Sequence, residues 1–441
     1  MQKKINQKLK KMKNSNRNGL LCIAIIGLLI AGINLNAQNW PQWRGIDQDG
    51  VSKETGLKLD WATSKPSLSW TFRQAGSGFS APTIVGTTLY GHGAADGKDF
   101  AFALDTQNGA LKWKQELGAE SVIERGNGPR GSVTIDGDKI YLIRGSGVIH
   151  CLSAADGNMI WMKDFNRDFN GNIMSQWGYS ESPLVDGNHV ICTPGGSKGT
   201  MVALDKNTGN LVWRTNDWND DSGYSSVIIA EVGGIRQYIQ QASRGVAGVS
   251  AKDGKLLWKV DYQTSGRAPS AVIPTPVFND NMVFVTNAYG CGCMGIRLSK
   301  EGEGIKAERI YSSNRDIVSQ HGGVVLINGY VYGFSEPPSN SWVCQNMATG
   351  EIVWSQSVRD AGIGKGSVFG VGDRLLCFDM ATGNLAVAAA SPNGWKEFGR
   401  IQIPERTKIA TQDNQLWTHP VVANGKLYLR DHDLLFCFDL N

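Results

Sequence analysis

Ionisable and aromatic side chains of mixed type occur in short Gly- and Ser-rich segments, each of which precedes an apolar stretch of the chain. In such a set His321 would act as a base, Tyr179 as an acid, and Arg130 would neutralise a carboxylate. The candidate catalytic residues are His321, Tyr179, Arg130 and His419. The candidate ligand-binding residues are Arg130, Trp177, Tyr179, Glu181, Tyr224, Arg267 and His321. This mixture suits either the binding of an anionic sugar or acid–base chemistry on one.

His321 is the sharpest candidate, because Gly322 and Gly323 follow it and allow a ligand to approach the backbone closely. The alternative interpretation is that all these groups hydrogen-bond the backbone where strands begin. The other histidines, His150, His189 and His432, lie within strand patterns, so we expect packed or surface side chains there. The sequence has no His-Glu-x-x-His spacing, and we predict no metal site.

A recurring phrase indicates how the chain positions these residues. Each copy ends a strand with a small residue and an acid, amide or hydroxyl, continues into a Gly turn, and reaches a Trp. The copies occupy residues 103–113, 151–161, 203–213, 249–258 and 344–354, and residues 377–383 keep the turn without the Trp. A phrase that returns roughly every 50 residues is typical of a repeat architecture.

A second phrase precedes the first and carries the candidate residues. It consists of a Gly- or Ser-rich start, an apolar strand, a two-residue turn and another strand. Its eight copies are centred on residues 82, 133, 183, 227, 276, 324, 368 and 420. Turns such as Asp136-Gly137 and Asn424-Gly425 suit tight hairpins, because Gly and Asn accept a positive φ. Each unit therefore predicts four antiparallel strands, and the chain predicts an all-β, eight-bladed β-propeller.

The two ends of the chain predict how the ring closes. The last unit stops at residues 436–441, where a third strand should lead into a Trp strand. Residues 67–72 form a Trp strand with no third strand before it. Pairing the two would complete the eighth blade and remove two exposed sheet edges. We interpret the recurrent Trp residues as structural, because their rings fill the contacts between blades.

Two units depart from the pattern. Unit five replaces the phrase with residues 294–298 and a polar stretch over residues 299–306. Unit seven has Ala386-Val387 in place of the Trp. Such irregularities indicate either drift of the repeat or an inserted ligand site.

Residues 1–37 have the composition of a signal peptide, with cleavage after Ala37. Seven Lys and Arg residues precede an apolar core over residues 20–33. A retained membrane anchor is the alternative, although the apolar run is shorter than the roughly 20 residues that span a bilayer. Without residues 1–37 the formal net charge changes from +4 to −3. The remaining 404 residues therefore show no basic footprint for nucleic acid.

Seven cysteines remain after cleavage. Cys151, Cys344, Cys377 and Cys437 share the phrase position where other copies have Ala or Val, so we expect small buried residues and not a disulfide framework. Cys22 follows two bulky leucines, where a lipid-attachment box needs small residues, so we predict no lipidation. Cys291 and Cys293 are separated by one Gly, and a disulfide between them would be strained.

The phrases resemble the PQQ-like (quinoprotein-type) repeats of eight-bladed propellers. Residues 204–213, with Asp205, Thr208, Gly209 and Trp213, are similar to the tryptophan-docking motif of that family. The likeness covers nearly the whole mature chain and includes residues 40–45, 177–183 and 321–323. It resembles most the exported, BamB-like branch. The resemblance implies a domain over residues 67–441, preceded by an N-terminal segment over residues 38–66.

The resemblance also raises pyrroloquinoline quinone as a cofactor. Family dehydrogenases stack it between a Trp and a ring of two adjacent cysteines, with a calcium ion and an Asp base. This chain has no adjacent cysteine pair, Cys291-Gly292-Cys293 being the nearest, and no Cys-x-x-Cys-His for haem. The resemblance thus leaves the quinone as an alternative that we do not favour, and the cofactor is otherwise unknown.

Three functions follow from these observations. We favour an exported binding or scaffold propeller that recognises a protein or glycan at the channel rim. The alternatives are a carbohydrate-active lyase or hydrolase, and a quinoprotein dehydrogenase. We expect a periplasmic or secreted monomer with an envelope protein or a glycan as partner, no nucleic acid, and no membrane span after signal cleavage.

Overall fold

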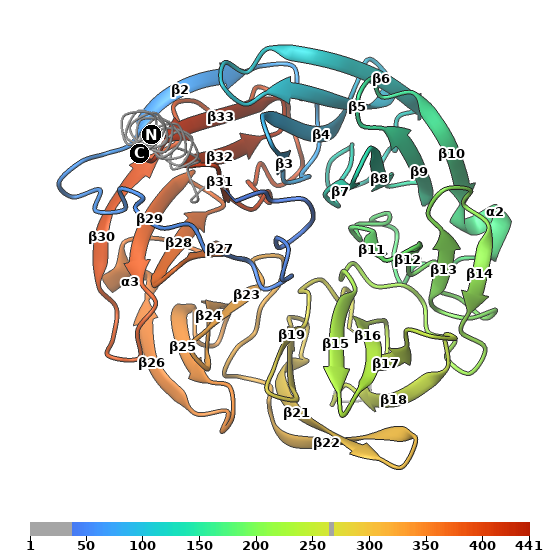
Figure 1. Cartoon of the computed structure of the whole chain (residues 1–441). Coiled ribbons are helices and arrows are strands. Elements are labelled where there is room, and N and C mark those ends of the chain that lie inside the picture. The colour runs from blue at the N-terminus through green and yellow to red at the C-terminus, as the bar shows by residue number, and fades with distance from the viewer. Residues whose placement is uncertain (1–37, 264–268) are drawn as a thin grey trace, which may run out of the picture. The chain divides into compact units, whose positions relative to one another are not determined.

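The computed structural model describes residues 38–263 and 269–441. Within these residues the strands form eight sheets, seven of four strands and one of five, arranged around a central channel (Figure 1). This confirms the predicted eight-bladed propeller. The predicted signal peptide, with Cys22, and the candidate Arg267 lie outside the described residues.

Blades 1 to 4 follow the chain without interruption. Blade 1 contains β3 (Thr83–Val85), β4 (Thr88–Ala95), β5 (Lys98–Asp105) and β6 (Leu111–Ala119). Blade 2 contains β7 (Thr134–Asp136), β8 (Lys139–Ile143), β9 (Val148–Ser153) and β10 (Met159–Asp164), followed by helix α2 (Phe165–Phe169). Blade 3 contains β11 (Leu184–Asp186), β12 (His189–Cys192), β13 (Val202–Asp205) and β14 (Leu211–Arg214). Blade 4 contains β15 (Ile228–Val232), β16 (Ile235–Gln241), β17 (Gly245–Ser250) and β18 (Leu256–Asp261).

Blades 5 to 8 complete the ring. Blade 5 contains β19 (Val277–Asn279), β20 (Met282–Asn287), β21 (Gly292–Glu301) and β22 (Gly304–Ser313). Blade 6 contains β23 (Val324–Ile327), β24 (Tyr330–Ser335), β25 (Ser341–Asn346) and β26 (Ile352–Ser357), followed by helix α3 (Val358–Ala361). Blade 7 contains β27 (Gly366–Val371), β28 (Arg374–Asp379), β29 (Asn384–Ala389) and β30 (Glu397–Gln402), with β1 (Val51–Ser52) parallel to β27. Blade 8 contains β31 (Val421–Ala423), β32 (Lys426–Asp431), β33 (Leu434–Asp439) and β2 (Ser67–Phe72).

The two ends of the chain meet in blade 8, as predicted. Strand β2 pairs antiparallel with β33, with Leu68 opposite Phe438 and Trp70 opposite Cys437. The backbone edge that β33 would otherwise expose is therefore paired.

Neighbouring blades are joined by an aromatic ring that lies on a turn glycine. A methyl group built on Gly109, Gly157 or Gly209 would come within 2.7 Å of the Trp ring of the preceding blade. Each indole also donates a hydrogen bond to a backbone carbonyl of the next blade, for example from Trp161 Nε1 to Lys206 O at 3.0 Å. Only glycine leaves room for this ring, and its φ near +70° suits glycine as well.

In unit five a tyrosine takes the place of the Trp. The Tyr311 ring lies on Gly350, and its hydroxyl donates to Met347 O at 2.7 Å. The irregular stretch of this unit is the long hairpin of β21 and β22. The polar residues 299–306 are thus part of an extended outer hairpin.

The structure corrects the interpretation of unit seven. Residues 377–383 form the turn between the second and third strands, because Asp379 ends β28 and Ala386 lies in β29. The turn that receives Trp354 comes after β29, where Ser391 O accepts its indole N–H at 2.8 Å. The Asp379 carboxylate accepts hydrogen bonds from the backbone N–H groups that follow it, as the Asp205 carboxylate does. The same turn motif therefore occurs at a different position in this blade.

The seven cysteines in the described part of the chain are free thiols, and all of those in strands are buried. Cys151, Cys344 and Cys437 lie opposite a Trp on the next strand, as their shared position in the phrase predicts. Cys377 is the exception, because it lies in a second strand and faces Ala386.

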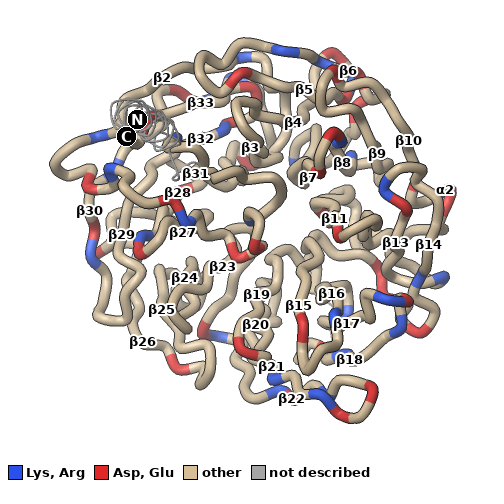
Figure 2. The backbone as a smooth tube through the Cα atoms, in the orientation of Figure 1, with Lys and Arg blue, Asp and Glu red and all other residues tan. Residues whose placement is uncertain are grey.

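The surface charge of the described residues is mixed. Positions of Lys and Arg and positions of Asp and Glu are both scattered along the outer strands and loops of the backbone drawn in Figure 2. Among residues 38–263 and 269–441 no helix has the length and apolarity needed to cross a bilayer.

Candidate functional site

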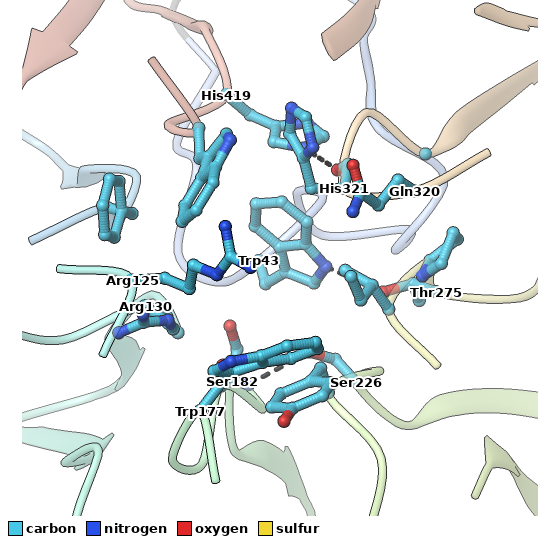
Figure 3. Close-up of a pocket in the computed structure, with 18 of the residues that line it drawn as sticks. Trp43, Arg125, Arg130, Trp177, Ser182, Ser226, Thr275, Gln320, His321 and His419 are labelled. Atoms are coloured by element: carbon cyan, nitrogen blue, oxygen red, sulfur yellow. Dashed lines mark hydrogen bonds between the residues drawn. The ribbon is translucent and has the colours of Figure 1, made fainter. Parts of the chain in front are cut away.

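The segments that lead into the innermost strands converge on one cavity of about 290 Å³. Seven blades contribute, because their first strands begin at the same end of the channel. The residues contributed in chain order are Phe79, Arg130, Ser180, Tyr224, Thr275, His321 and His419. We call this cavity the channel-mouth pocket. Of the predicted site residues it brings together Tyr224 and four that Figure 3 labels, namely Arg130, Trp177, His321 and His419.

The N-terminal segment crosses the channel and forms part of the pocket. Figure 1 shows this dark blue stretch running inside the ring. Trp43 lies in the middle of the labelled side chains in Figure 3, and its indole donates to Thr275 Oγ1 at 2.9 Å. The segment is held by the pairs Trp40 N to Ile84 O, Ile135 N to Pro41 O, Gln48 Nε2 to Val227 O, and β1 with β27. Trp43 and Arg44 therefore enter the site from a part of the chain outside the blades.

Among the residues that the structure describes, three guanidinium groups and one carboxylate line the pocket. Arg125 binds both oxygens of Asp413, at 3.1 and 3.0 Å, so the single acid is already neutralised. Arg44 is buried and donates to the carbonyls of Gln48 and Asp49. Burial lowers its pKa to about 10, which leaves it charged at neutral pH. The pocket thus has an excess of positive charge.

Arg130 is the cation best placed to receive an anion. Its Nη1 donates to Gly126 O at 3.1 Å, and its guanidinium lies 5.3 Å from the Phe79 ring centre. These contacts hold the group, while its buried Nη2 has no hydrogen-bond partner among the described residues. Burial lowers the pKa of Arg130 to about 10, so it also remains charged at neutral pH.

Further buried polar atoms of the pocket lack partners within the described part of the chain. They are Trp177 Nε1, Ser180 Oγ, His321 Nε2 and Trp417 Nε1. Because buried polar groups are almost always hydrogen-bonded, five such atoms around one cavity are unusual. Most of them are N–H or O–H donors, so the pocket suits a ligand rich in acceptor oxygens.

The two histidines are neutral in this environment. Burial, followed by the charge of Lys365, lowers the pKa of His321 well below its usual value. Burial also lowers the pKa of His419 to about 4, and its Nε2 bonds His321 O at 2.9 Å. His419 packs edge-on against Trp43, with 4.8 Å between ring centres. A base with so low a pKa accepts protons poorly, which favours binding over acid–base catalysis.

Two predicted residues point away from the pocket. Tyr179 is buried and donates to Pro194 O at 2.9 Å, whereas Glu181 accepts from Thr193 N and Thr193 Oγ1 at 2.8 and 2.7 Å. Ser180 and Ser182 line the cavity instead. In an extended segment alternate side chains face opposite ways, so the predicted Tyr179 and Glu181 lie on the side away from the cavity.

Several lining residues were not predicted. Trp43 and Arg44 come from the N-terminal segment, and Arg125 and Asp413 from long connections between blades. The sequence contains a signal for one further lining residue, Trp417, which precedes His419 by two residues just as Trp177 precedes Tyr179.

The residues present do not fit a quinone held in the family's manner. Among the described lining residues there is no cysteine, and the one carboxylate is paired with Arg125. Cys293 is buried elsewhere, with Sγ 3.8 Å from Gln345 Oε1. Within the described ranges no three His, Cys, Asp or Glu side chains are grouped to hold a metal.

Comparison with known proteins identifies the family of this chain. Residues 98–356 match the family described as outer membrane protein assembly factor BamB. The chain belongs to the BamB family. A relative of that name from Shewanella oneidensis is 22% identical over 425 residues, covering 91% of this chain and 95% of the relative. Another from Yersinia pestis is 24% identical over 287 residues, covering 63% and 65%.

Solved structures share the fold. BamB from Moraxella catarrhalis superposes with a TM-score of 0.55 at 18% identity, over 82% of this chain and 94% of that one. A quinohemoprotein alcohol dehydrogenase from Comamonas testosteroni gives 0.58 at 12% identity, over 94% and 82%. At these identities the likeness concerns the fold alone, so function must be argued from the pocket.

Proposed function

We propose that this BamB-family propeller is a recognition and scaffold protein of the bacterial envelope, and that it binds a partner at the channel-mouth pocket without transforming it. The observation that carries the proposal is the convergence of unpartnered buried donors on one positively charged cavity. A site that recognises a ligand needs such donors, whereas a catalytic site also needs a proton acceptor of suitable pKa. Neither histidine of the pocket meets that requirement.

The partner that we propose is an envelope protein docked over the channel mouth. The similarity to outer membrane assembly factors supports this class of partner. We also propose that residues 1–37 are removed as a signal peptide and that the protein acts in the periplasm. The lyase, hydrolase and dehydrogenase alternatives receive no support from the donor set described above.

Site-specific photo-crosslinking in the native host tests the proposal. Tyr289 lines the mouth and is 41% exposed, so a photoreactive residue there would contact a docked partner. Asn328 is the control, because it lies in the turn after β23, at the other end of a first strand. We expect a crosslinked envelope protein from position 289 and none from 328. Equal crosslinking from both positions, or none from either, would refute docking at the mouth.

A further inference from the structure

Resting on the proposed role of the pocket, we propose that its own small ligand is a ring compound that bears a carboxylate and no positive charge, namely a uronic acid residue of an acidic glycan. The protein partner would dock around the mouth, and the uronate would occupy the cavity beneath it.

Charge selects an anion. Within the described ranges the lining has three cations, Arg44, Arg125 and Arg130, and one carboxylate, Asp413, which Arg125 already binds through both oxygens. An ammonium group would find no free acid among the described lining residues, which disfavours amino sugars and free amino acids. Arg130 lines the cavity and its buried Nη2 has no hydrogen-bond partner among the described residues, and a guanidinium matches a carboxylate in shape and charge.

The remaining donors suit the hydroxyls of a sugar. The indole N–H groups of Trp177 and Trp417 and the hydroxyl of Ser180 are buried without partners in the described ranges. Sugar hydroxyls and ring oxygens accept such bonds.

Flat apolar surfaces and size complete the match. The rings of Trp43, Phe79, Trp177, Tyr224 and Trp417 line the cavity, and Trp177 lies 6.3 Å from Tyr224 between ring centres. Such faces pack against the C–H face of a sugar ring. A cavity of about 290 Å³ is at the small end of ligand pockets, which run from about 300 to 1,000 Å³. It accommodates one or two rings and not a folded segment.

Isothermal titration calorimetry of the mature chain with matched ligands tests the proposal. The ligands are galacturonate, its methyl ester, glucosamine and benzoate. We expect galacturonate to bind at least tenfold more tightly than the ester, which has the same ring without the charge, and glucosamine not to bind. No binding of galacturonate, or equal affinity for the ester, would overturn the proposal. Tighter binding of benzoate than of galacturonate would overturn the assignment to a sugar.

Variants locate the contact. We expect Arg130→Met to weaken galacturonate binding about tenfold or more, because it removes a charge-assisted hydrogen bond. Arg359→Met, on the exposed surface of α3, should leave the affinity unchanged. If Arg130→Met does not fold, Arg130→Lys keeps the charge but loses the fork, and should bind more weakly than wild type. Unchanged affinity in the folded Arg130 variant would overturn the assignment. Loss of galacturonate binding with intact crosslinking at position 289 would leave protein docking standing.

Discussion

The contact between Trp161 and Gly209 gives a quantitative prediction about the joints between blades. A methyl group at Gly209 would lie 2.7 Å from the Trp161 ring, closer than carbon atoms approach one another, so the indole must move. Gly187 is a matched control, because its φ of +59° is also left-handed but a methyl group there meets nothing within 4 Å. Both alanine variants pay about 1–2 kcal/mol for the left-handed backbone. Only Gly209→Ala adds the cost of overpacking, about 1–3 kcal/mol.

Urea unfolding of the two variants measures this difference. We expect Gly209→Ala to lose about 1–3 kcal/mol more free energy of unfolding than Gly187→Ala, since overpacking contributes that amount. In a Trp161→Leu background the two substitutions should lower the free energy of unfolding by nearly the same amount, because the indole ring that only Gly209→Ala would contact is absent. Equal losses in the Trp161 protein would show that the ring does not rest on Gly209.

Three further perturbations test other parts of the structure. Burial raises the pKa of Glu181 to about 8, so between about pH 4.5 and 8 the folded chain keeps this proton while the unfolded chain releases it. The free energy of unfolding should therefore fall across that window by up to about 5 kcal/mol. Thermal melting of Glu181→Gln should show no such fall. Trp70→Ala should cost about 3–5 kcal/mol in urea unfolding, because it empties the joint that closes the ring, and a loss below 1 kcal/mol would contradict that role. Tyr311→Phe leaves the carbonyl of Met347 without its donor and should lower the free energy of unfolding by about 1–3 kcal/mol. Tyr311→Trp should be better tolerated. A higher melting temperature for Tyr311→Phe than for Tyr311→Trp would show that Tyr311 does not replace the Trp.

The repeat pattern predicts the fold well because each blade is specified locally. Turn glycines, alternating apolar strands and the recurrent Trp recur in every regular copy, and the unpaired Trp70 strand predicts ring closure. Local pattern fails in unit seven, because the turn at Asp379 has the same hydrogen bonds wherever it occurs in a blade. The local pattern also misses Tyr311, because this tyrosine ring packs where the other blades have a Trp and the sequence around it does not match the repeat.

The site was predictable only in part. Arg130 and His321 were selected from the sequence because both precede a first strand, and the structure places both in the lining of the pocket. The choice between Tyr179 with Glu181 and Ser180 with Ser182 depends on which side of an extended segment faces the channel. Both sides of the segment carry polar residues, so the alternation of side chains along it does not show which side faces the channel. Trp43 reaches the pocket through contacts distant in sequence, and no local pattern encodes them.

The central claim is that the channel-mouth pocket recognises an acidic ring compound. Crystallographic density from protein purified from its native host tests it most directly. The account predicts a ring compound between Arg130 and His321, with a carboxylate on the Arg130 guanidinium. A cationic or uncharged molecule on these residues, or the pocket donors satisfied by side chains of the chain itself, would contradict it.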